Sequence, residues 1–225
     1  VAFFSGLGLG FGLGQEIETF TANSEETVTE EPGAYQSVER PAQKGQLLLE
    51  DDFGQPQWEV YDDGDHRKGY EEGQYFIVVE VEEFSYWSIA GKSLTDFILE
   101  VETTQVSGPD DNDYGLILRH QDDENFYSFE ISGDGYYTFD KLVAGELFDI
   151  IPWQESEVIR QGNGRNTLRV EAIGPNFSFY INDELVDAAI DSEFSQGDIG
   201  LVAGAYGQAG VHITFDNLKV WAVSK

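Results

Sequence analysis

The sequence predicts an all-β sandwich or barrel, and three observations carry that prediction. Aromatic residues make up 14% of the chain, which favours strands over helices. Short runs of alternating apolar and polar residues recur along the chain with turn residues between them. No helical periodicity extends over any long stretch. At 225 residues, a chain of this kind commonly forms one large β-sandwich domain.

Each expected strand is a run of alternating or apolar residues that ends at a turn signal. The turn signals include Gly133-Asp134-Gly135, Gly145-Glu146 and Asn182-Asp183, which tolerate the positive φ of tight hairpins. The expected strands are 46–53, 57–61, 74–82, 85–90, 97–106, 114–120, 125–131, 136–143, 146–150, 166–173, 176–181, 184–190, 198–205 and 211–223. Many short strands at this spacing are typical of a sandwich.

Three regions differ in composition. Residues 1–14 are an apolar, glycine-rich tail, residues 15–45 are an acidic extended linker, and residues 46–225 are the expected sandwich. In the tail, glycine alternates with large apolar residues, which would place the latter on one face of an extended strand. We expect an assembly role for the tail's apolar residues Phe3, Phe4, Leu7, Leu9, Phe11 and Leu13. The alternative is the remnant of a longer membrane anchor, because 14 residues fall short of a full span.

Charge and composition exclude several classes of function. The formal net charge of −31 repels phosphate backbones, so nucleic acid is not expected as a partner. The same field attracts divalent cations and suits a calcium-binding protein. Without cysteine, the chain has neither disulfides nor thiolate metal sites. The absence of methionine is consistent with removal of a secretory leader or of the initiator alone, and we expect a secreted or cell-surface location.

Four segments resemble a known family of domains. The stretch SGPDDNDYGLILRHQDDENFYSFEISGDGYYTF at 107–139 is similar to the laminin-G-like and concanavalin-A-like domains of bacterial surface proteins. NTLRVEAIGPNFSFYINDELV at 166–186, GDIGLVAG at 197–204 and FDNLKVW at 215–221 look like later strands of that fold. The resemblance implies a two-sheet antiparallel jelly-roll sandwich over about residues 46–223, preceded by the apolar N-terminal extension. Relatives include carbohydrate-binding modules, domains described as acting on 3-keto-disaccharides, and non-catalytic adhesion domains.

The resemblance also implies a structural calcium ion where the two terminal strands pair. The expected ligands are Asp51, Asp52, Asp216 and Asn217, since hard oxygen atoms are what calcium requires. A second candidate is the acidic loop with Asp110, Asp111 and Asp113. An ordinary solvated acidic turn is the alternative at each place.

Exposed aromatic rings on one sheet face would bind the apolar face of a sugar ring. The candidates are Tyr86, Trp87, Tyr136 and Trp153, with Tyr137 beside them. Burial in the core is the alternative for each, and alternation places at least one residue of each adjacent pair inward. A polysaccharide is therefore a candidate partner.

Catalytic machinery is not expected. Retaining glycosidases of similar fold carry a Glu-x-Asp-x-x-Glu strand, and the nearest residues here, Glu100 and Glu102, lack the Asp and the trailing Glu. We expect both to be solvent-facing. Three isolated histidines give no zinc-ligand spacing, and no Gly-x-Ser-x-Gly or phosphate-binding loop is present.

The sequence thus favours a non-catalytic surface module of structural or adhesive function. Its tail would dock on other copies of the chain, giving a filament, or on a membrane or surface complex. A carbohydrate-binding module is the alternative, and a glycoside-active enzyme is the third candidate.

Overall fold

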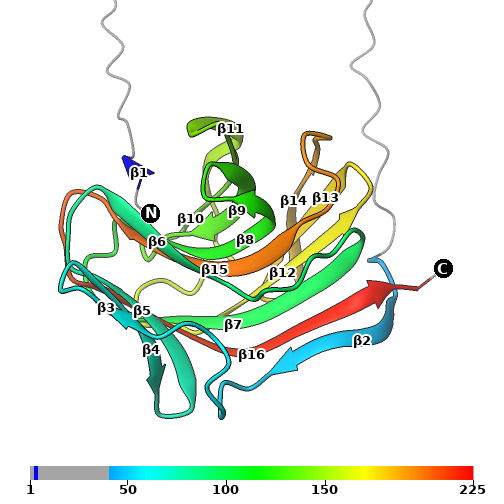
Figure 1. Ribbon diagram of the computed structural model, residues 1–225. Helices are drawn as coiled ribbons and strands as arrows, with labels where there is room; N and C mark the ends of the chain where they lie inside the picture. Colours follow the sequence, from blue (N-terminus) through cyan, green and yellow to red (C-terminus); the bar gives the residue numbers. More distant parts are fainter. Residues whose placement is uncertain (1–2, 5–40, 225) are drawn as a thin grey trace, which may run out of the picture. The chain divides into compact units, whose positions relative to one another are not determined.

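A computed structural model describes residues 3–4 and 41–224, and these residues form two stacked antiparallel sheets (Figure 1). The strands are β1 (Phe3–Phe4), β2 (Lys44–Asp51), β3 (Tyr61–Asp62), β4 (His66–Glu71), β5 (Gln74–Val79), β6 (Phe84–Ile89), β7 (Phe97–Ser107), β8 (Asn112–Asp122), β9 (Asn125–Ile131), β10 (Tyr136–Val143), β11 (Glu146–Glu155), β12 (Asn166–Ile173), β13 (Asn176–Ile181), β14 (Glu184–Ile190), β15 (Asp198–Ala205) and β16 (Val211–Val223). No helix occurs in the described ranges, so none there is long and apolar enough to cross a membrane. The predicted all-β sandwich is confirmed.

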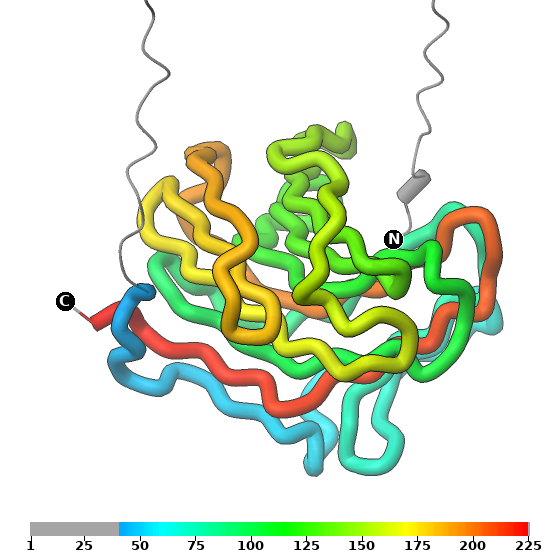
Figure 2. The backbone as a smooth tube through the Cα atoms, turned by 180° about the vertical axis from the view of Figure 1, so that it is seen from behind, coloured from blue at the N-terminus to red at the C-terminus, as the bar shows by residue number. Residues whose placement is uncertain are grey.

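One sheet has the order β1-β6-β15-β8-β9-β10-β11, and the other β14-β13-β12-β7-β16-β5-β4-β3 with β2 added beside β16. Strands distant in sequence are therefore neighbours, as β15 is inserted between β6 and β8. Figure 2 shows a second example. Strands β2 and β16 begin and end the sandwich in the sequence, and they run side by side in the structure. The pairing of the terminal strands that the resemblance implied is confirmed.

The core lies between the sheets and follows from the alternation of side chains along each strand. On β7, Phe97, Leu99 and Val101 are buried, and on β9 the aromatic rings of Tyr127 and Phe129 join them. Phe129 stacks on Phe179 of the opposite sheet, with ring centroids 4.7 Å apart. Such contacts close the sandwich because each buried aromatic ring removes a large apolar area from water.

Most predicted strands match the observed ones within a few residues, and two segments differ. Residues 57–61 were expected to form a strand, but only Tyr61–Asp62 pair there. Strand β4 was not predicted because its inward positions hold His66 and Lys68 instead of apolar residues. The buried ammonium of Lys68 is compensated by an ion pair with Glu59 (Nζ to Oε2, 2.6 Å) and by a hydrogen bond that it donates to the Trp87 carbonyl (2.8 Å).

The predicted assembly tail falls mostly outside the described residues. Leu7, Leu9, Phe11 and Leu13 are not described, and neither is the acidic linker up to residue 40. Within the tail, Phe3 and Phe4 form the short strand β1, which pairs with Ser85 and Phe84 of β6 in the same chain. For these two residues the backbone partner is intramolecular, and the assembly role of residues 1–14 stays a prediction.

Candidate functional site

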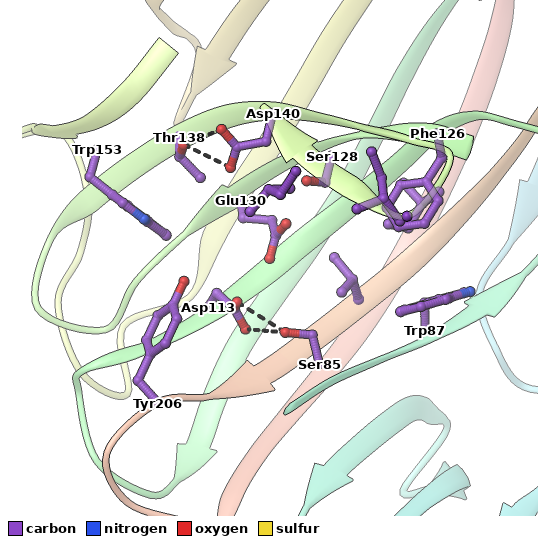
Figure 3. Close-up of a pocket in the computed structure, with 15 residues that line it drawn as sticks. Ser85, Trp87, Asp113, Phe126, Ser128, Glu130, Thr138, Asp140, Trp153 and Tyr206 are labelled. Carbon is purple, nitrogen blue, oxygen red and sulfur yellow. Dashed lines mark hydrogen bonds between the residues drawn. The ribbon is translucent and has the colours of Figure 1, made fainter. Parts of the chain in front are cut away.

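A pocket lies on the outer face of the seven-stranded sheet, built by the side chains that alternate away from the core (Figure 3). On β9, Tyr127, Phe129 and Ile131 point into the core, so Phe126, Ser128 and Glu130 point outward. The same alternation on the neighbouring strands brings five more polar or aromatic groups into the pocket. They are Ser85 and Trp87 of β6, Asp113 of β8, and Thr138 and Asp140 of β10.

A glycine lets two polar side chains meet on the pocket floor. Gly204 of β15 stands between Ser85 and Asp113 in the cross-strand register. Because Gly204 carries no side chain, the Ser85 hydroxyl reaches over it and donates a hydrogen bond to Asp113 (Oγ to Oδ2, 3.2 Å). A Cβ at position 204 would lie 1.9 Å from Asp113 Oδ1 and 2.2 Å from Ser85 Oγ. The glycine is therefore part of the site's construction.

Glu130 sits in the centre of the floor, between Gly115 of β8 and Thr138 of β10 in the register. Its side chain lines the pocket, although the residue is only 8% exposed. One oxygen, Oε2, makes no hydrogen bond of ordinary geometry with a described residue, although Ser128 and Asp113 lie close enough to act on the carboxyl. A buried carboxylate oxygen without a donor is costly, so this atom identifies a position where a ligand group can be bound.

The floor carboxyl groups have raised pKa values. Burial raises the pKa of Asp113 to about 6, against the opposing effect of hydrogen bonds from Ser85 and Tyr206. Burial, and then the charge of Asp113, raises the pKa of Glu130 well above its usual range. The pKa of Asp140 rises to about 7 through burial, although Thr138 donates a hydrogen bond to its carboxylate. The Asp113–Glu130 pair therefore keeps a proton at neutral pH, since two adjacent buried carboxyls resist double ionisation.

Aromatic rings form the two ends of the pocket. Trp153 of β11 and Tyr206, after β15, approach edge to face with ring centroids 6.5 Å apart. At the other end Trp87 and Phe126 pack at 5.2 Å. The cavity volume is about 140 Å³, close to the roughly 150 Å³ of a cavity that accepts benzene, so the pocket has room for about one six-membered ring.

The predicted sugar-binding aromatic residues divide as alternation requires. Trp87 and Trp153 line the pocket, and Tyr136 lies beside Trp153 and Tyr206 in an adjoining hollow. Tyr86 instead belongs to the inner core and stacks on His66 with ring centroids 3.7 Å apart, as Tyr137 also belongs to that core. Tyr86 therefore does not line this pocket, because its strand turns it to the opposite face. It borders a separate hollow with His66, and a sugar-binding role for Tyr86 stays a prediction.

The predicted calcium ligands at the terminal strands have protein partners of their own. Asp51 is buried and accepts hydrogen bonds from the Phe53 amide (2.8 Å) and the Trp58 indole (3.0 Å). Asp52 accepts from the Gly54 amide (3.0 Å). Asp216 and Asn217 lie on β16, where the Asp216 carboxylate accepts from the Asn217 amide and, weakly, from a glutamine. In the described residues, no group of three or more acidic or histidine side chains is arranged so that it could hold a metal ion, and calcium here stays a prediction.

The second predicted metal loop is divided between two places. Asp110 accepts a hydrogen bond from Gln105 (3.0 Å), and Asp111 is exposed at the adjoining hollow. Asp113 instead belongs to β8 and lines the pocket. Sequence proximity grouped these acids because it does not show where the loop ends and the strand begins.

Glu100 and Glu102 lie outside the pocket, on the nine-stranded sheet. Glu100 forms an ion pair with Lys44 (2.8 Å), and Glu102 forms one with Arg165 (2.9 Å). Both side chains are partly exposed, as expected for positions on an outer face.

The sequence interpretation missed Ser85, Glu130, Asp140 and Tyr206. The alternation in 125–131 does place Glu130 outward, so its orientation could have been found. Its proximity to Asp113 and Tyr206 depends on the sheet order, which the sequence pattern does not contain.

The family of this chain is shown by comparison with family models. The model of the 3-keto-alpha-glucoside-1,2-lyase-like domain matches residues 46–220, and the chain belongs to this family. No curated protein matches the sequence.

Solved structures confirm the predicted jelly-roll fold. The chain is similar to the carbohydrate-binding module CBM66 from Bacillus subtilis, with 24% identity, coverage of 73% of this chain and 91% of that chain, and a TM-score of 0.52. A Bacillus subtilis protein of unknown function with a galectin-like fold has a TM-score of 0.62, at 10% identity over 82% and 100% of the chains. An endo-β-galactosidase from Clostridium perfringens that releases GlcNAcα1-4Gal has a TM-score of 0.58, at 13% identity over 81% and 64%.

Proposed function

We propose that this chain is a carbohydrate-binding domain and that one sugar ring of its ligand occupies the pocket on the seven-stranded sheet. The observation that carries the proposal is the combination of aromatic walls with a polar floor in one ring-sized cavity. An aromatic face covers the apolar C–H groups of a sugar, and the floor exchanges hydrogen bonds with its hydroxyls. The similarity to CBM66 and to a galactosidase supports a saccharide over other ring-shaped ligands.

The proposal is tested by titrating neutral and charged oligosaccharides into the protein and into Trp153→Ala. Trp153 is 36% exposed, so its removal spares the core. Loss of the stacking surface, worth about 1–2 kcal/mol, should weaken binding roughly tenfold. Leu185→Ala, at an exposed apolar position on β14, is the matched control and should bind normally. Equal affinities for Trp153→Ala and the parent protein would place the ligand elsewhere.

A second candidate function is proton-transfer catalysis, favoured by the Asp113–Glu130 pair. A pocket carboxyl whose pKa lies near neutrality suits a general acid or base. The name of the family describes a 1,2-lyase acting on 3-keto-glucosides. In such an elimination a base removes the proton from C2, acidified by the C3 ketone. The bond from C1 to the departing oxygen then breaks, and that oxygen takes up a proton.

Incubation with a 3-keto-glucoside distinguishes the two functions. A binding domain leaves the compound intact, whereas a lyase releases the alcohol in a reaction that Asp113→Asn and Glu130→Gln each slow by at least a hundredfold. The same experiment tests the prediction that the chain is not an enzyme.

The structural or adhesive function with assembly through residues 1–14 has less support than carbohydrate binding. The family name and the similar solved structures point instead to proteins that bind or cleave carbohydrates. Deletion of residues 1–14 remains its test, and an unchanged oligomeric state would reject the assembly role.

A further inference from the structure

The pocket carries acidic groups with no balancing base. Its lining includes Asp113, Glu130 and Asp140, and none of its lining residues is lysine, arginine or histidine. The other ionisable groups that act on these carboxyls are Tyr206 and Asp149, both acidic. The chain as a whole has a net charge of −31, so the surrounding field has the same sign. An anionic saccharide such as a uronate would be repelled.

Glu130 adds an independent observation that points to a ligand. Its Oε2 is buried, makes no hydrogen bond of ordinary geometry in the described part of the chain, and belongs to a side chain that lines the cavity beside Asp113. In Figure 3 the carboxylates of Glu130 and Asp113 approach each other in the space between Trp153 and Trp87. A donor group entering that space would satisfy Oε2 directly.

We propose that the pocket selects an amino sugar, with the ammonium group bound between Glu130 and Asp113. This inference rests on the proposed carbohydrate-binding function and names the class of sugar. A hydroxyl could satisfy Oε2, but it would leave the charge of the carboxyl cluster uncompensated. An ammonium does both, since charge-assisted hydrogen bonds are about twice as strong as neutral ones. Trp153 and Tyr206 line the same pocket, and aromatic rings close to a bound cation attract it.

Binding of an ammonium group should release a proton from the pocket to the solvent. The Asp113–Glu130 pair keeps a proton at neutral pH because both groups are buried and close to one another. A cation placed between them stabilises the doubly ionised form, so the shared proton leaves for the solvent. A neutral sugar produces no such release.

The test compares three pairs of monosaccharides that differ only in replacement of the 2-hydroxyl by an ammonium: glucose and glucosamine, galactose and galactosamine, mannose and mannosamine. Calorimetric titrations at pH 7 and about 0.15 M salt, in buffers of different ionisation enthalpy, give affinity and proton release together. At least one amino sugar should bind at least tenfold more tightly than its neutral partner and release up to one proton. In Glu130→Gln the preference should fall below about twofold.

Glu184→Gln is the matched control, because Glu184 is an exposed glutamate in the β13–β14 hairpin region. It should keep the full preference, whereas attraction to the overall acidic surface alone would survive in both variants and overturn the proposal. Equal binding of neutral and amino sugars would overturn the amino-sugar inference and leave carbohydrate binding intact. If no saccharide of either kind binds, the proposed function fails as well.

Discussion

At the residue scale, two glycines on the seven-stranded sheet serve different purposes. A Cβ at Gly204 would meet the ends of the Asp113 and Ser85 side chains, which can move. A Cβ at Gly115 would lie 2.2 Å from the Phe129 carbonyl oxygen, which belongs to the backbone of β9. A side chain at position 204 would therefore disturb the pocket, whereas a side chain at position 115 would disturb the pairing of β8 with β9.

We therefore predict that Gly204→Ala weakens carbohydrate binding about tenfold with little loss of stability. The reason is that the added methyl group displaces the Asp113 carboxyl and the Ser85 hydroxyl, which line the pocket and can exchange their mutual hydrogen bond for bonds to water. Gly115→Ala should instead destabilise the protein by about 1–3 kcal/mol because strands must separate. Calorimetric titration and urea unfolding of both variants measure the two effects. Similar stabilities for the two variants would contradict this division.

The pocket carboxyls also predict a dependence of stability on pH. Asp140 has a pKa of about 7 in the folded protein against an ordinary value of 3.8, so the folded state holds a proton that the unfolded chain releases. Its contribution is complete below about pH 4 and is lost as the pH rises to about 7. Three pKa units correspond to about 4 kcal/mol at most.

Asp140→Asn should flatten the fall in unfolding free energy between pH 4 and pH 8 by a few kcal/mol. Urea unfolding at several pH values measures it, with Glu184→Gln as the exposed control. General charge repulsion contributes equally to both variants, so an identical slope in Asp140→Asn and in the parent protein would refute the assignment.

At the element scale, one arginine of β8 holds three loops by hydrogen bonds to their backbone carbonyls. Arg119 is fully buried and donates hydrogen bonds to the carbonyls of Phe194 (2.8 Å), Thr95 (3.2 Å) and Gly174 (2.7 Å). Its guanidinium carbon also lies 4.8 Å from the centre of the Phe177 ring. The planar fork of donors makes these contacts at once, which an ammonium cannot reproduce.

Arg119→Lys should therefore lower the unfolding free energy by about 2–4 kcal/mol, since buried carbonyls lose their donors. Arg165→Lys changes an exposed arginine in a surface ion pair with Glu102 and should cost below about 0.5 kcal/mol. Urea unfolding compares the two. Equal losses would show that Arg119 does not hold the three loops.

The elements also show how far the sequence allows prediction. Alternation is strong on β9, β10 and β12–β14, and the predicted bounds there equal the observed ones. It fails for β4, where Lys68 occupies an inward position through its ion pair with Glu59. For the site, alternation orients Glu130 outward, but only the insertion of β15 between β6 and β8 brings Ser85 next to Asp113. Neighbours across strands are set by topology, which a local pattern does not encode.

At the scale of the whole molecule, the net charge of −31 predicts a dependence on salt. Self-repulsion destabilises a compact acidic chain, and the Debye length falls from about 30 Å at 0.01 M to about 8 Å at 0.15 M salt. We expect the melting temperature to rise by several degrees over this range of sodium chloride with EDTA present. A melting temperature that is flat or falls would contradict the expectation, and sucrose controls for general solvent effects.

A saccharide bound between Trp153 and Trp87 is what the proposed function requires. The most direct measurement is an NMR titration of isotope-labelled protein with the tightest-binding amino sugar. We expect the largest shifts on the Trp153 indole and on the amides of Asp113 and Glu130. Shifts centred on Glu100 and Glu102, on the outer face of the nine-stranded sheet, or no shifts at saturating sugar, would contradict it.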